Sequence, residues 1–179
     1  MVGNELWNAP VIRADYAHVI QGARVVLVIS QTTLAALQAK VTNLPPCKVC
    51  LLATEEEGES PLGPPDGPPT LLVFGRHDSY FAKGQDILVR LWPRVTAALP
   101  DARLMFVGGG LKLAELRNLA AGSPAHENIN VKGFVEEQDI LPIWQQASAL
   151  ALISSLEGFG LVIAEAMRHG RPVLASLQD

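Results

Sequence analysis

The stretch ALALISSLEGFGLVIAEAMRHGRPVLAS, residues 149–176, contains the signals that decide the fold. It begins with the apolar run ALALISS, which has the length and composition of a buried strand. A glycine-rich turn leads into GLVIAEAMRH, whose apolar residues recur at helical spacing, and Gly170 and Pro172 then end the predicted helix. A second short apolar run closes the stretch. We therefore predict a strand–helix–strand unit whose strands are buried on both faces, as in a parallel sheet.

The same alternation extends toward the N-terminus. Predicted strands lie in TLLVFG, ARLMFVGGG and NINVKGFV, and helical segments separate them. We expect Pro93 to bend or restart the first of these helices. The apolar faces predicted for the helices after the first and third strands consist of Ile87, Leu88, Leu91, Trp92 and Val95, and of Ile140, Leu141, Ile143, Trp144 and Ala147. Continuous apolar strands that alternate with helices predict a doubly wound, Rossmann-like α/β domain with a parallel sheet.

A change in composition at residues 55–69 divides the chain. The segment is acidic at its start and rich in Pro and Gly, which favours an extended linker over a helix or an inner strand. Residues 1–54 contain one more β-α-β pattern, in which Ser30 can cap the helix that follows. A piece of this size buries little apolar surface. We interpret residues 1–54 as the remnant of a larger N-terminal domain and residues 70–179 as a second domain.

Composition excludes some classes of function. The chain has 179 residues and a net charge of -4, so it lacks the basic character of a nucleic-acid-binding protein. It shows no apolar run of membrane-spanning length and no secretory signal, so we expect a cytoplasmic protein. Cys47 and Cys50 form a C-x-x-C pattern, with Cys50 in a predicted buried strand. Because no second Cys or His pair matches it, we favour plain cysteines over redox or zinc chemistry.

Doubly wound domains bind ligands beyond the carboxyl ends of their strands, and the first such loop is GRHDSYFAKG. Arg76 and Lys83 lie seven positions apart in it, between Gly75 and Gly84. Two cations close to a helix start are suited to bind a diphosphate, although two solvated surface charges are the alternative.

The next two strand ends also carry glycine. The GGG around Gly109 allows close approach of a ligand, but it is not a dinucleotide-binding G-x-G-x-x-G, and a tight turn is an equal alternative. At VKGFV, the backbone of Gly133 and Phe134 is a candidate for reading the edge of a nucleobase. The alternative is a turn with Phe134 in the core.

Two glutamates, Glu157 and Glu165, stand eight positions apart around the last loop. We expect the helix to start near Gly160, so that Gly158 and Gly160 leave the first helical amides open to a phosphate. Glu165 would then lie about 7 Å along the helix axis, where a carboxylate can accept hydrogen bonds from ribose hydroxyls. A catalytic acid/base pair of the glycosidase kind and two solvated glutamates remain as alternatives.

The combined motifs resemble the retaining GT-B glycosyltransferases of family 4. The matching segments are GRHDSYFAKGQD, PDARLMFVGGG, the GF of VKGFV, and EGFGLVIAEAMRHGRPVLAS with its E-x7-E spacing. The resemblance implies that residues 70–179 form the donor-binding domain of an enzyme that transfers a sugar from a UDP- or GDP-sugar with retention of configuration. Residues 14–54 look like the last β-α-β of the family's acceptor-side domain.

The resemblance also implies roles for single residues. Arg76 and Lys83 would hold the diphosphate and stabilise its charge as it leaves. Glu157 would lie near the donor sugar and leaving phosphate and complete the catalytic set with Arg76 and Lys83, and Glu165 would bind the ribose. The donor-binding set implied is Gly75, Gly109, Gly133, Phe134, Gly158, Phe159, Gly160, Leu161 and Glu165. No cofactor and no metal are expected, because the cations supply the positive charge and no Asp-x-Asp motif occurs.

The chain departs from the family pattern at both ends, since it holds part of the acceptor-side domain and stops where the family continues. We therefore expect little or no transferase activity from this chain alone. His18, in what looks like the inter-domain helix, is not assigned a catalytic role. A non-catalytic nucleotide-binding or interaction module remains an alternative, and so does a related GT-B epimerase, which the E-x7-E disfavours. The acceptor is unknown; relatives that act on glycans or lipid-linked sugars make a place at the inner membrane face compatible with the family.

Overall fold

In the computed structural model, which describes residues 12–54, 61–77, 83–155, 157 and 159–176, the chain separates into two units. The smaller unit extends to Thr54, and the loop residues Glu157 and 159–161 group with it. The remaining described residues form the larger unit.

The smaller unit contains a parallel strand pair with a helix between the strands. Its elements are α2 (Ala14–Gln21), β1 (Val26–Val28), α3 (Gln31–Lys40) and β2 (Cys47–Val49). The predicted cap of α3 is confirmed, because the Ser30 hydroxyl accepts a hydrogen bond of 3.0 Å from the Thr33 amide. The core of this unit consists of Ile12, Ile20, Val28, Leu37 and Val41.

The cysteines of the smaller unit differ from the expectation. Strand β2 ends at Val49, so Cys50 lies beyond it and is exposed, whereas Cys47 is half-buried. The prediction of a buried strand through Cys50 is wrong, since Leu51 and Leu52 after it are exposed as well. Both cysteines are free thiols.

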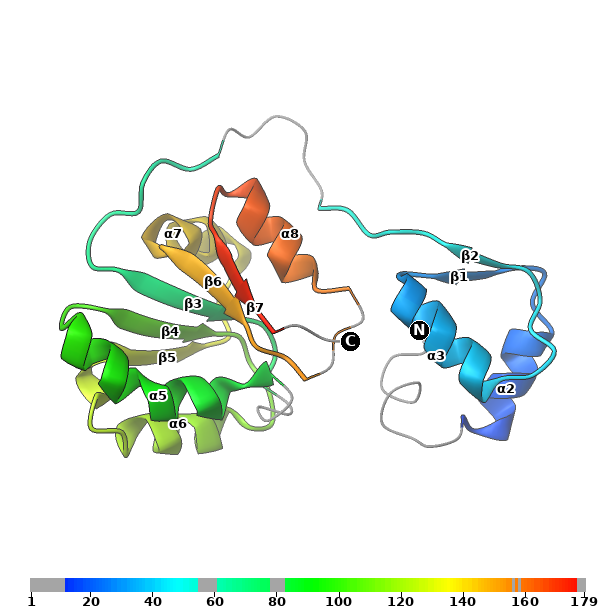
Figure 1. The fold of residues 1–179 in the computed structure, drawn as a ribbon, viewed down its shortest axis with the longest axis horizontal. Coiled ribbons are helices and arrows are strands. Elements are labelled where there is room, and N and C mark those ends of the chain that lie inside the picture. Colours follow the sequence, from blue (N-terminus) through cyan, green and yellow to red (C-terminus); the bar gives the residue numbers. More distant parts are fainter. Residues whose placement is uncertain (1–11, 55–60, 78–82, 156, 158, 177–179) are drawn as a thin grey trace. The chain divides into compact units, whose positions relative to one another are not determined.

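The larger unit is a doubly wound α/β domain, which confirms the predicted fold class (Figure 1). Its described residues form a five-stranded sheet in the order β5-β4-β3-β6-β7, and each pair of neighbouring strands is parallel. Its elements are β3 (Thr70–Phe74), α5 (Gln85–Ala98), β4 (Arg103–Val107), α6 (Leu113–Ala121), η1 (His126–Asn128), β5 (Ile129–Gly133), η2 (Glu137–Asp139), α7 (Ile140–Gln146), β6 (Ala149–Leu152), α8 (Leu161–Arg168) and β7 (Val173–Ala175).

Helices cover both faces of this sheet, with α5 and α6 on one side and α7 and α8 on the other (Figure 1). Each face has its own core. Leu104 and Phe106 of β4 point toward α5 and α6, and they pack with Trp92 and Leu116. On the opposite face, Leu72, Met105 and Leu150 pack with Trp144 of α7 and Ala166 of α8. The apolar strands β3, β4 and β6 therefore contribute alternate side chains to the cores on both faces of the sheet.

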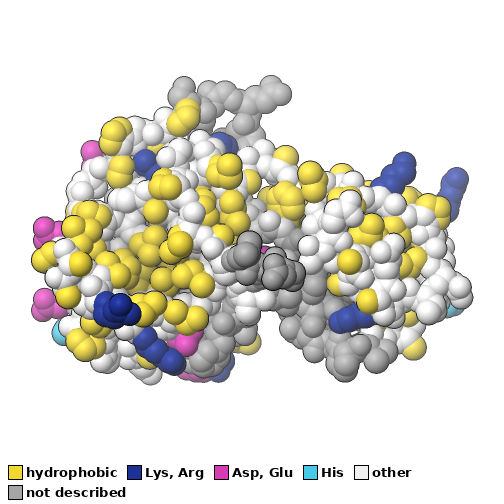
Figure 2. Space-filling model, in the orientation of Figure 1, with side chains coloured by type: hydrophobic (Ala, Val, Ile, Leu, Met, Phe, Trp, Pro, Cys, Tyr) yellow, Lys and Arg dark blue, Asp and Glu magenta, His cyan; other side chains and the backbone are white. Residues whose placement is uncertain are grey.

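Helix α5 is continuous, and its buried face differs in part from the prediction. It continues through Pro93 without restarting, since a proline removes a single amide donor from the helix. Its buried face contains Leu88, Val89 and Trp92, whereas Ile87 is 45% and Leu91 42% exposed. Figure 2 shows apolar side chains gathered on the visible face of the larger unit, over this helix. Leu141 of α7 was likewise expected in the core and is exposed.

The end of α8 is built as the sequence predicts. Gly170 has a φ of +69°, its amide donates to Met167 O, and the Arg171 amide donates to Ala166 O. These are the two hydrogen bonds of a Schellman motif. The buried Arg171 side chain also donates to Gly63 O at 2.8 Å, which attaches the described part of the linker to the larger unit.

Candidate functional site

The topology of the larger unit indicates which edge of its sheet is the candidate binding site. Because the strands are parallel, their carboxyl ends meet at the same edge. The chain adds strands outward from β3 to β5 and then returns to place β6 on the other side of β3. The loops after β3 and β6 therefore leave from neighbouring strands and diverge, which creates the switch point where doubly wound sheets bind ligands.

Glycine backbone connects the strand ends at this edge. Gly108 has a φ of +130°, and its amide donates to Gly133 O at 2.7 Å. A Cβ added to Gly108 would lie 1.9 Å from Gly75 O, so a side chain does not fit there. Gly109 lies beside Phe134, since an added Cβ would be 3.5 Å from Phe134 Cβ. The structure thus brings together Gly75, Gly109, Gly133 and Phe134, as the interpretation of the strand ends requires.

The side chain of Phe134 points away from the core and is 73% exposed. The alternative in which Phe134 is a core residue of a turn is therefore wrong. Gly133, with a φ of +86°, also lies against Arg117 of α6, whose Nη2 would be 3.1 Å from an added Cβ. Arg117 donates to Lys132 O at 3.4 Å and adds a cation that the sequence did not single out.

Arg76 and Lys83 both lie at the end of β3. Arg76 follows Gly75 directly and is exposed. Lys83 is half-buried, and its Cε lies 4.0 Å from the position that a Cβ of Gly75 would occupy. Gly84, with a φ of +65°, is the N-cap of α5. Residues 78–82 of the predicted loop lie outside the described residues, and the strand end and helix start that flank them bring the Lys83 side chain to the backbone next to Arg76.

A buried polar pair lies close to these cations in the sequence and was missed by the sequence analysis. His77 and Gln85 are each 0% exposed, and Gln85 Nε2 lies 3.1 Å from His77 Nδ1. The His77 ring packs edge-on against Phe106, with 6.2 Å between the ring centroids. Its amide donates to Gly109 O, and its carbonyl accepts from the Lys112 amide, both at 2.8 Å. The sequence gives little signal for this pair beyond its nearness to the cations, since His77 follows Arg76 directly and Gln85 follows Lys83 by two residues.

The two glutamates are placed on either side of the α8 start in the sequence. Helix α8 begins at Leu161, directly after Gly160 with its φ of +76°, which confirms the predicted start. Glu157 is half-buried in the loop before it. Glu165 lies about 6 Å along the helix axis at 1.5 Å per residue. The position of Gly158 lies outside the described residues.

Glu165 is partly buried, and this burial raises the pKa of its carboxyl group, whereas the positive charge of Arg168 acts in the opposite direction. A carboxylate that has already lost part of its hydration gains more from a hydrogen-bonding ligand than a fully solvated one. Phe159 and Gly160 of the predicted donor-binding set are half-buried, and Leu161 is exposed.

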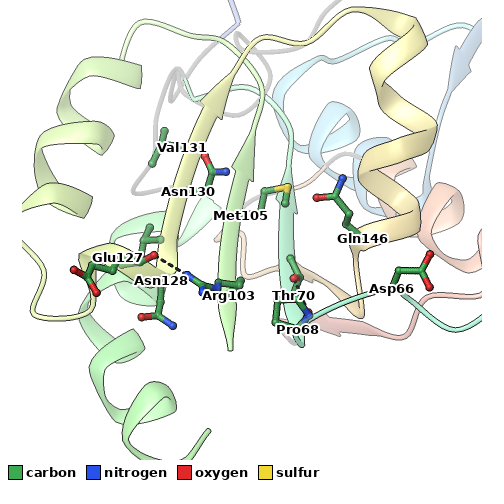
Figure 3. A pocket seen from close by; sticks show the side chains of 11 residues that line it. Asp66, Pro68, Thr70, Arg103, Met105, Glu127, Asn128, Asn130, Val131 and Gln146 are labelled. Carbon is green, nitrogen blue, oxygen red and sulfur yellow. Dashed lines mark hydrogen bonds between the residues drawn. The ribbon is translucent and has the colours of Figure 1, made fainter. Parts of the chain in front are cut away.

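A hollow of about 450 Å³ lies at the opposite, amino edge of the sheet (Figure 3). Arg103 donates to Glu127 O at 2.8 Å on one side of it, and Gln146 and Asp66 stand on the other side. Its lining consists of Asp66, Pro68, Thr70, Arg103, Met105, Glu127, Asn128, Ile129, Asn130, Val131 and Gln146. None of the residues predicted for ligand binding lines it. We therefore place the candidate site at the carboxyl edge, where the strand order reverses, rather than in this hollow.

Within the described residues, no group of three or more His, Cys, Asp or Glu side chains is placed to hold a metal ion. The helices in the described part of the chain are each too short or too polar to cross a membrane.

Comparison with known proteins defines the class of protein. Residues 68–178 match the family described as "Glycosyl transferases group 1", and the chain belongs to this family. Over 100 residues it is 37% identical to a GDP-mannose-dependent monoacylated alpha-(1-6)-phosphatidylinositol monomannoside mannosyltransferase of Corynebacterium glutamicum. That match covers 52% of this chain and 26% of the relative, so the chain spans about a quarter of the relative's length.

Solved glycosyltransferase structures show the same fold. The pneumococcal O-GlcNAc transferase GtfA in complex with UDP and GlcNAc matches with a TM-score of 0.74 and 20% identity, over 94% of this chain and 33% of that one. Anabaena HepE in complex with UDP and glucose matches with a TM-score of 0.70 and 22% identity, over 89% of this chain and 46% of that one. At these identities the likeness shows the GT-B type of α/β fold and no more.

Proposed function

We propose that the larger unit binds the nucleotide-sugar donor of a glycosyltransferase reaction. The observation that carries this proposal is the placement of Arg76 and Lys83 at the end of β3, next to the switch point of the sheet. A nucleoside diphosphate carries negative charge on both phosphates, and paired cations at a strand end are suited to it. Membership of the group 1 glycosyltransferases supports a sugar diphosphate as the ligand.

In this proposal the leaving group is the nucleoside diphosphate. Arg76 and Lys83 bind its phosphates and stabilise the negative charge that grows as the bond to the sugar breaks. The first amides of α8, after Gly160, supply further donors to the phosphates. Glu165 accepts hydrogen bonds from the ribose hydroxyls, and Glu157 lies near the donor sugar. The remaining donor contacts come from the glycine backbone of the strand ends and from Phe134.

We further propose a retaining enzyme of family 4, because the Glu157–Glu165 spacing matches the E-x7-E motif of that family. The base is uracil or guanine: the Corynebacterium relative depends on GDP-mannose, whereas the GtfA and HepE structures contain UDP. No metal is needed in this account, because Arg76 and Lys83 provide the positive charge.

The remaining parts of the proposal concern the whole protein. Residues 1–54 belong to the acceptor-side domain, residues 55–69 are the linker, and residues 70–179 form the donor-binding domain. The name of the Corynebacterium relative, which acts on a phosphatidylinositol monomannoside, supports a glycolipid or glycan acceptor. Such an acceptor fits an enzyme that works in the cytoplasm at the inner membrane face.

Calorimetric titration of the full chain with UDP, GDP and ADP tests the donor site. We expect UDP or GDP to bind, and we expect Lys83→Ala and Arg76→Ala each to weaken binding at least tenfold, since a charge-assisted hydrogen bond contributes about 1.5–3 kcal/mol. Lys48→Ala and Arg94→Ala remove exposed cations outside the site and should leave binding unchanged. Binding that survives loss of both Arg76 and Lys83 would contradict the proposal.

A further inference from the structure

We propose that the buried pair His77–Gln85 consists of positioning residues that fix the cations Arg76 and Lys83 for a diphosphate. This inference rests on the proposed function of the site. Neither side chain reaches solvent, and their hydrogen bond of 3.1 Å joins the segment after β3 to the first turn of α5. Arg76 precedes His77 by one residue and Lys83 precedes Gln85 by two, so Arg76 lies directly before the segment that this bond closes and Lys83 lies within it.

His77 contacts the larger unit through its backbone, through Gln85 and through the Phe106 ring. Its amide donates to Gly109 O at 2.8 Å, and its carbonyl accepts from the Lys112 amide at 2.8 Å. Its backbone is therefore attached to the segment after β4. Its ring packs edge-on against Phe106, which is fully buried in the core on the α5 side. A buried polar ring gains stability from a hydrogen-bond partner, and Gln85 supplies one for Nδ1.

The start of α5 is fixed in the same way. A Cβ added to Gly84 would lie 2.6 Å from Ile153 O, so this glycine brings the helix start into contact with the end of β6. Gln85 follows and attaches the same turn to the end of β3 through His77. The start of helix α5 is thereby held against both strands of the switch point, and Lys83 lies one residue before this fixed turn.

A fixed pair of cations matters for a diphosphate in particular. Two cations on a mobile loop lose conformational entropy when a ligand orders them, which lowers the affinity. Cations that are already in place avoid this loss. A ligand that needs both cations at once benefits most, so the pair should favour a nucleoside diphosphate over the corresponding monophosphate.

Four variants test this inference on the full chain. Gln85→Met keeps the volume of the side chain and removes its polar atoms, and His77→Phe keeps the ring against Phe106 and removes Nδ1. The double variant tests whether the two residues act as a unit. His77→Asn retains a polar atom near the position of Nδ1 and serves as the rescue. The matched controls are Gln145→Met and His126→Phe, which change exposed side chains of the same unit.

The first readout is the ratio of GDP to GMP affinity, or of UDP to UMP affinity. We expect the ratio to fall about five- to tenfold in Gln85→Met and in His77→Phe, as loss of one buried hydrogen bond implies. The double variant should lose no more than either single variant, because partners in one bond are not additive. His77→Asn should recover most of the ratio, and the controls should keep it. An unchanged ratio in folded Gln85→Met and His77→Phe would overturn the inference.

The second readout needs no nucleotide. Hydrogen exchange of the His77 and Lys112 amides should speed up in Gln85→Met, because both amides donate the hydrogen bonds that join the backbone around His77 to the segment after β4. If the unmodified chain binds no nucleotide, the proposed function fails, and exchange alone then decides the anchoring role. Exchange rates equal to those of the parent chain would reject that role as well.

Discussion

The two edges of the sheet in the larger unit differ in how they are built. The carboxyl edge consists of glycine backbone in close contact, with Arg76 and Lys83 beside it and the buried His77–Gln85 pair behind it. The amino edge has the hollow of about 450 Å³, lined by side chains of mixed polarity. The strand reversal and the predicted residues lie at the carboxyl edge and not at the hollow. The two edges therefore offer different chemistry to a ligand, and the carboxyl edge is the one that we propose for a diphosphate.

The largest expected effect tests the glycine contact at the carboxyl edge. Gly108→Ala would bring a Cβ to 1.9 Å from Gly75 O, and we expect it to lower the free energy of unfolding by about 3 kcal/mol or more. Gly67→Ala is the matched control, since Gly67 also has a positive φ but has nothing within 4 Å of an added Cβ. Urea unfolding measures both, and equal losses would refute the role of the close contact.

Removal of the Arg171 side chain tests the attachment of the linker, which forms one wall of the hollow at the amino edge. Arg171→Met leaves Trp144 O and Gly63 O without their donor, so we expect a loss of about 2 kcal/mol. Proteolysis within the linker should become faster. Arg94→Met, at an exposed position of α5, should change neither quantity. A linker that stays protected in Arg171→Met would show that other contacts hold it.

The raised pKa of Glu165 predicts opposite effects on stability and binding. The folded state binds this proton more tightly than the unfolded state, so the contribution of Glu165 to stability is fully present below its unfolded pKa and is lost as the pH rises through its folded pKa. At pH 7 the Glu165→Gln variant should therefore be slightly more stable than the parent chain. At pH 4 this difference in stability should be smaller. The variant should also bind UDP or GDP about tenfold more weakly, through loss of charged hydrogen bonds to the ribose.

Thermal unfolding at the two pH values and calorimetric titration measure these effects. A variant that loses stability at pH 7, or that keeps full nucleotide affinity, would contradict the role given to Glu165.

The smallest effect is expected at the amino edge. Asn130→Ala changes an exposed residue that lines the hollow, so it should alter the free energy of unfolding by less than about 0.5 kcal/mol. Nucleotide affinity should not change at all, because the variant lies at the opposite edge from the proposed site. A loss of affinity in the same titration would place the ligand in the hollow.

The sequence predicted those parts of the fold that depend on local pattern. Alternating apolar strands and helices gave the doubly wound sheet, and Gly170 gave the end of α8. The orientation of α5 was predicted less well, because Ile87 and Leu91 lie next to the buried stripe in the helical repeat. Neither Phe134 nor Cys50 is in the core, since burial depends on what covers a strand end and not on hydrophobicity alone.

The candidate site was predictable to the extent that glycines and charges mark strand ends. Arg76 and Lys83 were found in this way. The pair His77–Gln85 was not, because a polar residue in a loop looks solvated until tertiary contacts bury it. The hollow at the amino edge could not be predicted from the sequence either, because its lining comes from separate segments that include the linker, α7 and the starts of three strands.

The central claim is that a nucleoside diphosphate binds at the carboxyl edge of the larger unit. Backbone amide resonances of the full chain, followed by NMR during titration with GDP and UDP, test it most directly. The account predicts that the largest shift changes occur at Gly75, Gly109 and Gly133. Changes confined to Arg103, Asn130 and Gln146 would instead place the ligand in the hollow at the amino edge and contradict the account.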